Sequence, residues 1–165
     1  MGANLKEANL REVDFEGANL IGTSLWATSL QWADLYGVQL QRSNLSQADA
    51  RDANFSLANM RFCTFHETNL MGANFYRANV ENANLTRVHS INSTWVRANL
   101  MGANLTQADL RWSNLRRANF TGANLQGTQL RGANLTDIIL PNGEKFHPQK
   151  SDLSQFTGLR DSSLI

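Results

Sequence analysis

The stretch Met101-Gly-Ala-Asn-Leu105, Thr106-Gln-Ala-Asp-Leu110, Arg111-Trp-Ser-Asn-Leu115 decides the fold. In each of these three pentapeptides the last residue is large and apolar, and the residue two before it is small. Asn or Asp stands between them, and the other two positions vary freely. We call the apolar residue position i, so that the small residue is i−2, the Asn or Asp is i−1, and the free positions are i+1 and i+2.

The rule holds from residue 5 to residue 140 without a slip in register. Only Ala50 and Ser90 are small at position i, and position i−2 stays small, with Cys63 as its one cysteine, until Ile138. A period of five fits neither an α-helix, with 3.6 residues per turn, nor a strand with a period of two. It suits a short segment that turns a corner every five residues and points i and i−2 inward. Such a unit buries its apolar face only by stacking on copies of itself, which predicts a solenoid.

These pentapeptides resemble the pentapeptide-repeat family, whose pattern is A-(D/N)-L-x-x, over residues 1–140. The uninterrupted form, rich in Gly-Ala-Asn-Leu, looks most like the cyanobacterial-type members. The resemblance implies an all-β fold, a right-handed quadrilateral parallel β-helix with four pentapeptides in each coil and about seven coils.

The aromatic residues give an independent check on a coil of twenty residues. Four of the six aromatics at position i are Phe15, Phe55, Phe75 and Trp95, which fall in one column at that spacing. Ala50 and Ser90 also share a column, and each precedes an aromatic residue. This is expected if a narrow, densely packed interior has room for only a small side chain beside a large ring. We therefore predict a core that includes Phe15, Ala50, Phe55, Phe75, Ser90, Trp95 and Leu105.

Two further features of the repeat predict local structure. Eight glycines occupy position i+2, which favours type II turns at those corners because the third residue of such a turn has a positive φ. The Asn and Asp side chains at i−1 are expected to form ladders along the rod.

The rule ends at Leu140, which divides the chain into a β-helix of residues 1–140 and a C-terminal turn and helical cap of residues 141–165. Pro141-Asn-Gly143 predicts a turn, followed by a short returning strand at Lys145-Phe146. We expect a helix from Ser151 as N-cap to Gly158 as its stop. The residues available to cover the last coil are Phe146, Leu153 and Phe156.

Composition excludes several classes of function. The net charge is +1, but residues 1–60 hold four basic and seven acidic side chains, whereas residues 61–140 hold eight and four. No apolar run has the length of a membrane span, and no leader is recognisable, so we expect a cytoplasmic protein without a membrane partner. The single cysteine, Cys63, and three scattered histidines offer no metal or cofactor site and no catalytic group. We expect no enzyme and no nucleic-acid partner.

Basic residues gather on the outward positions. Arg77, Arg97 and Arg117 form one i+2 column, with Arg116 beside it, and the adjacent face carries Arg111, Trp112 and Arg131. Like charges stacked directly on one another repel, which favours an acidic partner. The alternative is a solvated ladder whose guanidinium groups lie on neighbouring side chains.

A second candidate surface is aromatic. Trp26, Trp32 and Tyr36 all point outward from the second coil, and aromatic clusters are enriched at interfaces. Dimerisation and the docking of another protein both remain open for this patch.

For function, the resemblance implies a non-enzymatic rigid scaffold for protein–protein interaction, of unspecified process. The alternative comes from one group in the family that protects DNA gyrase, a type II topoisomerase, by resembling duplex DNA in shape and negative charge. The basic residues 61–140 present the opposite field, which weakens that alternative.

Overall fold

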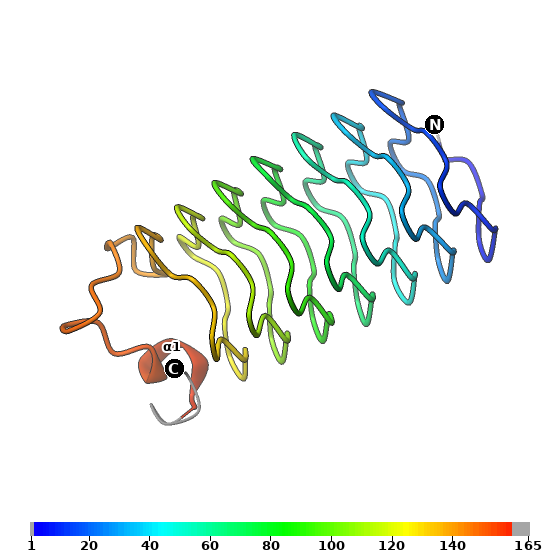
Figure 1. The fold of residues 1–165 in the computed structure, drawn as a ribbon. Coiled ribbons are helices and arrows are strands. Elements are labelled where there is room, and N and C mark those ends of the chain that lie inside the picture. The colour runs from blue at the N-terminus through cyan, green and yellow to red at the C-terminus, as the bar shows by residue number, and fades with distance from the viewer. Residues whose placement is uncertain (1, 160–165) are drawn as a thin grey trace.

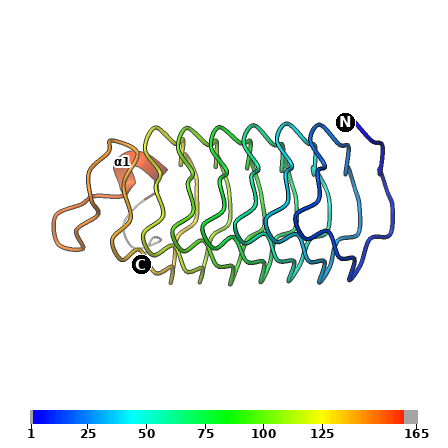
Figure 2. The same cartoon turned by 90° about the horizontal axis from the view of Figure 1, so that it is seen from above.

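The structure, a computed structural model, describes residues 2–159 and is a right-handed β-helix closed at its C-terminal end by a short cap. Figures 1 and 2 show the coils stacked in single file, with the first coil at one end of the rod and the cap with helix α1 at the other. Residues 160–165 of the predicted C-terminal segment lie outside the described residues.

Parallel bridges join each i−1 residue to the residue twenty positions later. The series begins with Asn4 and Ser24 and ends with Asn119 and Ile139. The amide of Leu5 donates to the carbonyl of Ser24 (2.8 Å), and the amide of Ser24 donates to the carbonyl of Ala3 (2.9 Å). This pairing confirms the coil of twenty residues that the aromatic column predicted. Each strand is a single bridge, because a corner interrupts the chain every five residues.

The predicted aromatic column forms the centre of the interior. The rings of Phe55 and Phe75 stack with centroids 4.9 Å apart, and those of Phe75 and Trp95 stack at 3.8 Å. Ala50 and Leu105 are also buried, as predicted. Phe15 is only half-buried, because it lies in the first coil, which a neighbouring coil covers on one side only.

Ser90 does more than leave room for the indole of Trp95. The indole Nε1–H donates to Ser90 Oγ (3.1 Å) and to Ser93 Oγ (2.8 Å). Ser93 Oγ also donates to the Ser90 carbonyl (2.6 Å), and so does Ser113 Oγ from the next coil (2.6 Å). All three serines are buried. The size argument was correct but incomplete, because the small residue also supplies a hydrogen-bond acceptor.

The type II geometry extends to every corner and is not confined to the glycines. All nineteen non-glycine residues at i+2 from Glu7 to Asp137 have φ between +53° and +61°, whereas no i+1 residue has a positive φ. The amide of Ala8 donates to the carbonyl of Leu5 (3.2 Å), which closes the first of these turns. Coil-to-coil pairing therefore imposes the left-handed conformation on residues that do not prefer it.

The side chains at i−1 rarely form the expected ladders. Most of them accept a hydrogen bond from their own chain two residues on, as Asn4 Oδ1 does from the Lys6 amide (3.2 Å). In residues 2–159, Asn or Asp side chains at i−1 bond to the i−1 side chain of a neighbouring coil in two places, Asn54 to Asp34 and Asn99 to Asn79. The local bond wins because the corner already presents the i+1 amide to a short side chain.

The predicted turn and returning strand of the cap are present. The amide of Gly143 donates to the carbonyl of Leu140 (2.9 Å), and Lys145 forms an antiparallel bridge with Ile139. Leu153 is buried against the last coil, and Phe146 and Phe156 are half-buried there.

The helix of the cap is shorter than predicted. Helix α1 spans Ser154–Thr157 and ends, as expected, at Gly158, whose φ is +68°. Its N-cap is Leu153 and not Ser151, whose hydroxyl accepts from the amide of His147 (2.9 Å). Asp152 accepts from the Ser154 amide instead (2.8 Å). The described part of the chain contains no helix with the length and apolarity that a membrane crossing requires.

Candidate partner-binding surface

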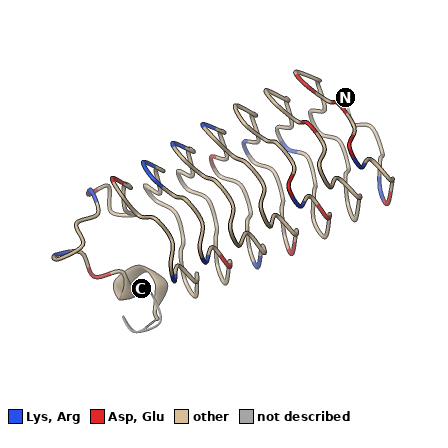
Figure 3. Cartoon of the chain, viewed as in Figure 1, with Lys and Arg blue, Asp and Glu red and all other residues tan. Residues whose placement is uncertain are grey.

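The arginine column stands on one corner of the rod, as the twenty-residue coil requires. The amide of Arg77 donates to the carbonyl of Val96 (2.9 Å) and that of Arg97 to the carbonyl of Arg116 (3.0 Å), so these residues lie on successive coils. Figure 3 shows the basic residues repeating along this edge of the stack. Tyr76, next to the column, is 38% exposed.

The members of the column differ in their partners. Arg117 forms an ion pair with Asp137 (3.3 Å). Arg77, Arg97 and Arg116 are exposed, and within residues 2–159 none of them forms an ion pair. The corner therefore carries three unneutralised guanidinium groups next to one neutralised group.

The adjacent face is less uniformly basic than its residue types indicate. Arg111 is held by Asp109 through Nε to Oδ1 (2.8 Å) and Nη2 to Oδ2 (2.7 Å). The ring of Trp112 is 59% exposed and lies against Gly132. Arg131 is exposed and has no ion pair among the described residues.

The residues of the predicted aromatic patch occupy three successive corners of the second coil. Trp32 and Tyr36 lie on one side of the coil and are 52% and 40% exposed. Trp26 lies in the corner Leu25–Thr28, whereas Trp32 lies in the next corner, Leu30–Ala33, and Trp26 is only half-buried. The three aromatic residues therefore stand at three corners, and their common role as one surface stays a prediction. The guanidinium of Arg11 lies 4.9 Å from the ring of Trp32.

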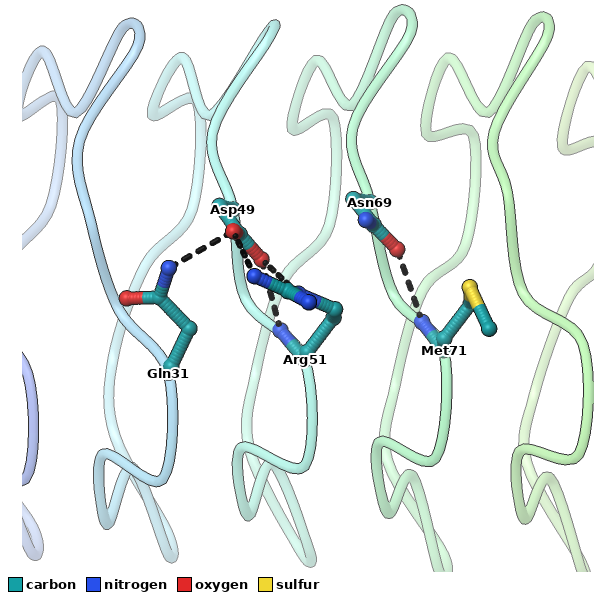
Figure 4. A network of polar contacts seen from close by, with 5 residues as sticks. All are labelled: Gln31, Asp49, Arg51, Asn69 and Met71. Atoms are coloured by element: carbon teal, nitrogen blue, oxygen red, sulfur yellow. Dashed lines mark hydrogen bonds and ion pairs between the residues drawn. The ribbon is translucent and has the colours of Figure 1, made fainter.

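A polar network on the side between these corners was not predicted. Arg51 binds Asp49 through Nε (2.9 Å) and Nη2 (2.7 Å), and Gln31 Nε2 donates to Asp49 Oδ2 (2.6 Å) (Figure 4). Burial raises the pKa of Asp49, but the hydrogen bonds from Arg51 and Gln31 outweigh it, so the pKa lies below 3.8. The signal was available in the sequence as Asp at i−1 and Arg at i+1, a pattern that Asp109 and Arg111 repeat.

Figure 4 also shows what replaces this pair one coil later. There Asn69 Oδ1 accepts from the Met71 amide (3.3 Å), and the Met71 side chain is 40% exposed. The Asp–Arg pairs therefore add side-chain hydrogen bonds to the ordinary local bond of the repeat, which the amides of Arg51 (3.4 Å) and Arg111 (3.2 Å) still make.

Two depressions mark the surface. One, of about 500 Å³, is polar and is lined by Gln47, Glu67, Arg87, His89, Gln107, Asp109 and Gln129. The other, of about 480 Å³, lies between the last coil and the cap and is lined by Gly132 to Asp137 with Phe146, Pro148 and Leu153. Within residues 2–159, no group of three or more His, Cys, Asp or Glu side chains is placed to hold a metal ion.

Sequence comparison finds one family. A profile described as pentapeptide repeats, with eight copies, matches residues 1–37, 33–70, 53–89 and 97–137. No curated protein sequence matches the chain.

Among solved structures, the chain is similar to QnrB1, a plasmid-mediated fluoroquinolone resistance protein. One trypsin-treated variant of QnrB1 aligns with a TM-score of 0.73 and 17% identity over 80% of this chain and 67% of that one. A second variant aligns at 0.67 over 97% and 83%, also with 17% identity. HetL from the cyanobacterium Nostoc sp. strain PCC 7120, a pentapeptide repeat protein involved in heterocyst differentiation regulation, gives 0.46 and 22% over 87% and 92%. At these identities the likeness to QnrB1 concerns the fold alone.

Proposed function

This chain belongs to the pentapeptide-repeat family, and from that premise we propose that it is a rigid, non-enzymatic scaffold for protein–protein interaction in the cytoplasm. Continuous pairing between coils and a buried aromatic column favour a stiff rod. Its uninterrupted coils support grouping it with the cyanobacterial-type members. On a rod of this kind, the outward i+1 and i+2 side chains supply the contacts.

The observation that carries the proposal is the unneutralised corner. Arg51, Arg61, Arg87, Arg111 and Arg117 all have acidic partners. Arg77, Arg97 and Arg116 have none in the described part of the chain, although the repeat places them close together. An acidic protein surface would relieve their mutual repulsion, and Arg pairs well with carboxylates in a bidentate manner.

The test is affinity capture from the native cytoplasm with the wild-type chain and with Arg77→Glu plus Arg97→Glu. We expect the double variant to lose specific partners. The matched control is Lys6→Glu plus Arg42→Glu, which changes the charge equally at two other exposed positions. If both double variants recover the same proteins as the wild type, the arginine corner is solvated surface and this proposal for it fails.

A second candidate is a binder of DNA gyrase or a related type II topoisomerase. The fold likeness to QnrB1, a fluoroquinolone resistance protein, favours it. The basic corner opposes it, because a mimic of DNA must present a negative field. A supercoiling assay with titrated protein, with and without a fluoroquinolone, decides the question. If the protein neither protects nor inhibits gyrase, this candidate is eliminated.

Trp32 and Tyr36 offer a separate docking area for a partner or for a second copy. Sedimentation velocity across a range of concentrations distinguishes the two. A dimer that Trp32→Ala plus Tyr36→Ala dissociates would assign this side to self-association.

A further inference from the structure

The cap leaves one side of the last coil without a strand above it. Lys145 pairs with Ile139 on one side, and the carbonyl of Thr157 accepts from the amide of Gly127 (2.6 Å) on another. Between them, Gly132 to Asp137 line the apolar groove of about 480 Å³ together with Phe146, Pro148 and Leu153. In Figure 1 the orange chain of the cap swings wide of the stack before it returns at α1.

The cap covers the inward residues of this side only in part. One coil earlier, Ser113 and Leu115 are 1% and 0% exposed. Their counterparts Ala133 and Leu135 are only half-buried. The groove is therefore the place that the next strand of the repeat would fill.

The backbone of the same side presents an unpaired strand edge. One coil earlier, the amide of Leu115 donates to Asn134 (3.0 Å) and that of Arg117 donates to Thr136 (2.9 Å). The equivalent amides, those of Leu135 and Asp137, have no backbone acceptor within residues 2–159. Likewise the carbonyl of Ser113 accepts from Asn134 (2.9 Å), whereas that of Ala133 accepts from no backbone amide in this range. An open edge of this kind is a template for another strand.

Cations stand at both ends of the open side. Arg131 directly precedes Gly132, and Arg116 lies on the preceding coil beneath Thr136. Both are exposed, and neither forms an ion pair with a described residue. Asp137, the acid that lines the groove, is already engaged by Arg117 (3.3 Å). Charge complementarity therefore selects a ligand with acidic ends.

We propose that this groove binds an extended segment of a partner protein, which adds a parallel strand to the last coil. The segment would place a small side chain above Ala133 and a large apolar one above Leu135, with acidic residues at its two ends. Its carbonyls would accept from the amides of Leu135 and Asp137, and its central amide would donate to the Ala133 carbonyl. Strand addition of this type takes affinity from main-chain bonds and specificity from alternate side chains. The proposal rests on the scaffold function and names the kind of partner.

The probe is a fluorescein-labelled peptide of sequence Asp-Gly-Ala-Asn-Leu-Thr-Asp, which continues the inward pattern of the repeat. We expect saturable binding to the full chain in fluorescence anisotropy. Binding should weaken about tenfold or more when the peptide Leu is replaced by Asp, because a carboxylate would enter the apolar groove. It should weaken similarly when the peptide Asn is replaced by Pro, which removes the central amide donor. Hydrogen exchange at the amides of Leu135 and Asp137 should slow when the peptide is bound.

Matched protein variants locate the site. Ala133→Glu points a charge into the groove and should abolish binding, whereas Met101→Glu adds the same charge at an outward position away from the groove and should retain it. Circular dichroism checks that both variants are folded. No saturable binding to the wild type, or equal binding to both variants, would overturn the proposal.

Two other occupants are distinguishable. A concentration-dependent dimer that Ala133→Glu dissociates would make the groove a self-interface, and tighter peptide binding in Leu164→Asp plus Ile165→Asp would make the C-terminus of the chain its occupant. Either result overturns the proposal. The two proposals can fail separately. If the peptide does not bind but Arg77→Glu plus Arg97→Glu still loses partners in the affinity capture, the groove proposal fails and the scaffold function stands.

Discussion

Replacing Ser90 and Ser93 by alanine separates two physical accounts of the interior. If Ser90 is small only to make room for the indole of Trp95, alanine serves as well and stability is unchanged. The structure instead gives the indole Nε1–H two acceptors, at 3.1 Å on Ser90 and 2.8 Å on Ser93. The double variant leaves this buried donor without a side-chain acceptor.

The magnitude follows from the burial of the group. Trp95 is 1% exposed, so water cannot replace the lost acceptors without a rearrangement. An unsatisfied buried donor costs about 1–3 kcal/mol. At about 2–4 °C per kcal/mol for a chain of this size, a cost of about 2 kcal/mol lowers the Tm by about 4–8 °C. Each single variant should cost less, because the indole keeps one acceptor.

The assay is urea unfolding followed by far-UV circular dichroism, in the wild-type background and in Trp95→Phe. Phenylalanine has no donor, so the serine replacements should cost at most about half as much in that background. An equal cost in both backgrounds would refute the hydrogen-bond reasoning and leave volume as the only role of Ser90.

Three further predictions test other parts of the structure. Leu105→Asp places a carboxylate at a site that is 1% exposed and should prevent folding, whereas Gln107→Asp at an exposed corner should fold normally by circular dichroism. Burial raises the pKa of Asp109, but the hydrogen bonds from Arg111 outweigh it and hold the pKa below 3.8. The stability that ionised Asp109 contributes is therefore present above that pH and is lost as the pH falls through the lower pKa of the native state. In urea unfolding, the free energy of unfolding should fall between about pH 5 and about pH 2.5, and Asp109→Asn should make this fall smaller. Burial raises the pKa of the Cys63 thiol to about 12, so a thiol reagent at about pH 8 should label it only after unfolding, and rapid labelling of the native chain would contradict its placement.

The length of the coil was predictable because burial constrains every inward position. Phe55, Phe75 and Trp95 follow one another at intervals of twenty residues, and a narrow interior leaves few ways to arrange three large rings. The bridges and the stacked rings confirm this inference. Hydrogen bonds inside the core were not predictable at the same level, since the pattern that marks Ser90 as small does not say what its hydroxyl contacts.

The outward surface is less predictable than the interior. The five-residue repeat alone assigns Trp26 and Trp32 to separate corners, but it does not say what their side chains contact. The cap was harder, because α1 is one turn long and is positioned by docking, with the Thr157 carbonyl on the Gly127 amide (2.6 Å). No periodicity in residues 141–159 shows which side of the last coil stays open, and so the groove could be found only in the folded chain.

The direction of the backbone hydrogen bonds has a mechanical consequence. They run along the rod axis from each coil to the next. A force that pulls the two ends of the rod apart is therefore parallel to these bonds, and it acts on the bonds of one coil after another and not on all of them together. The coil with the weakest hydrogen bonds to its neighbour then separates first, and each separated coil releases twenty residues, which extend to about 65 Å. The packed interior makes the rod resist bending, but under tension along its axis the rod unfolds one coil at a time.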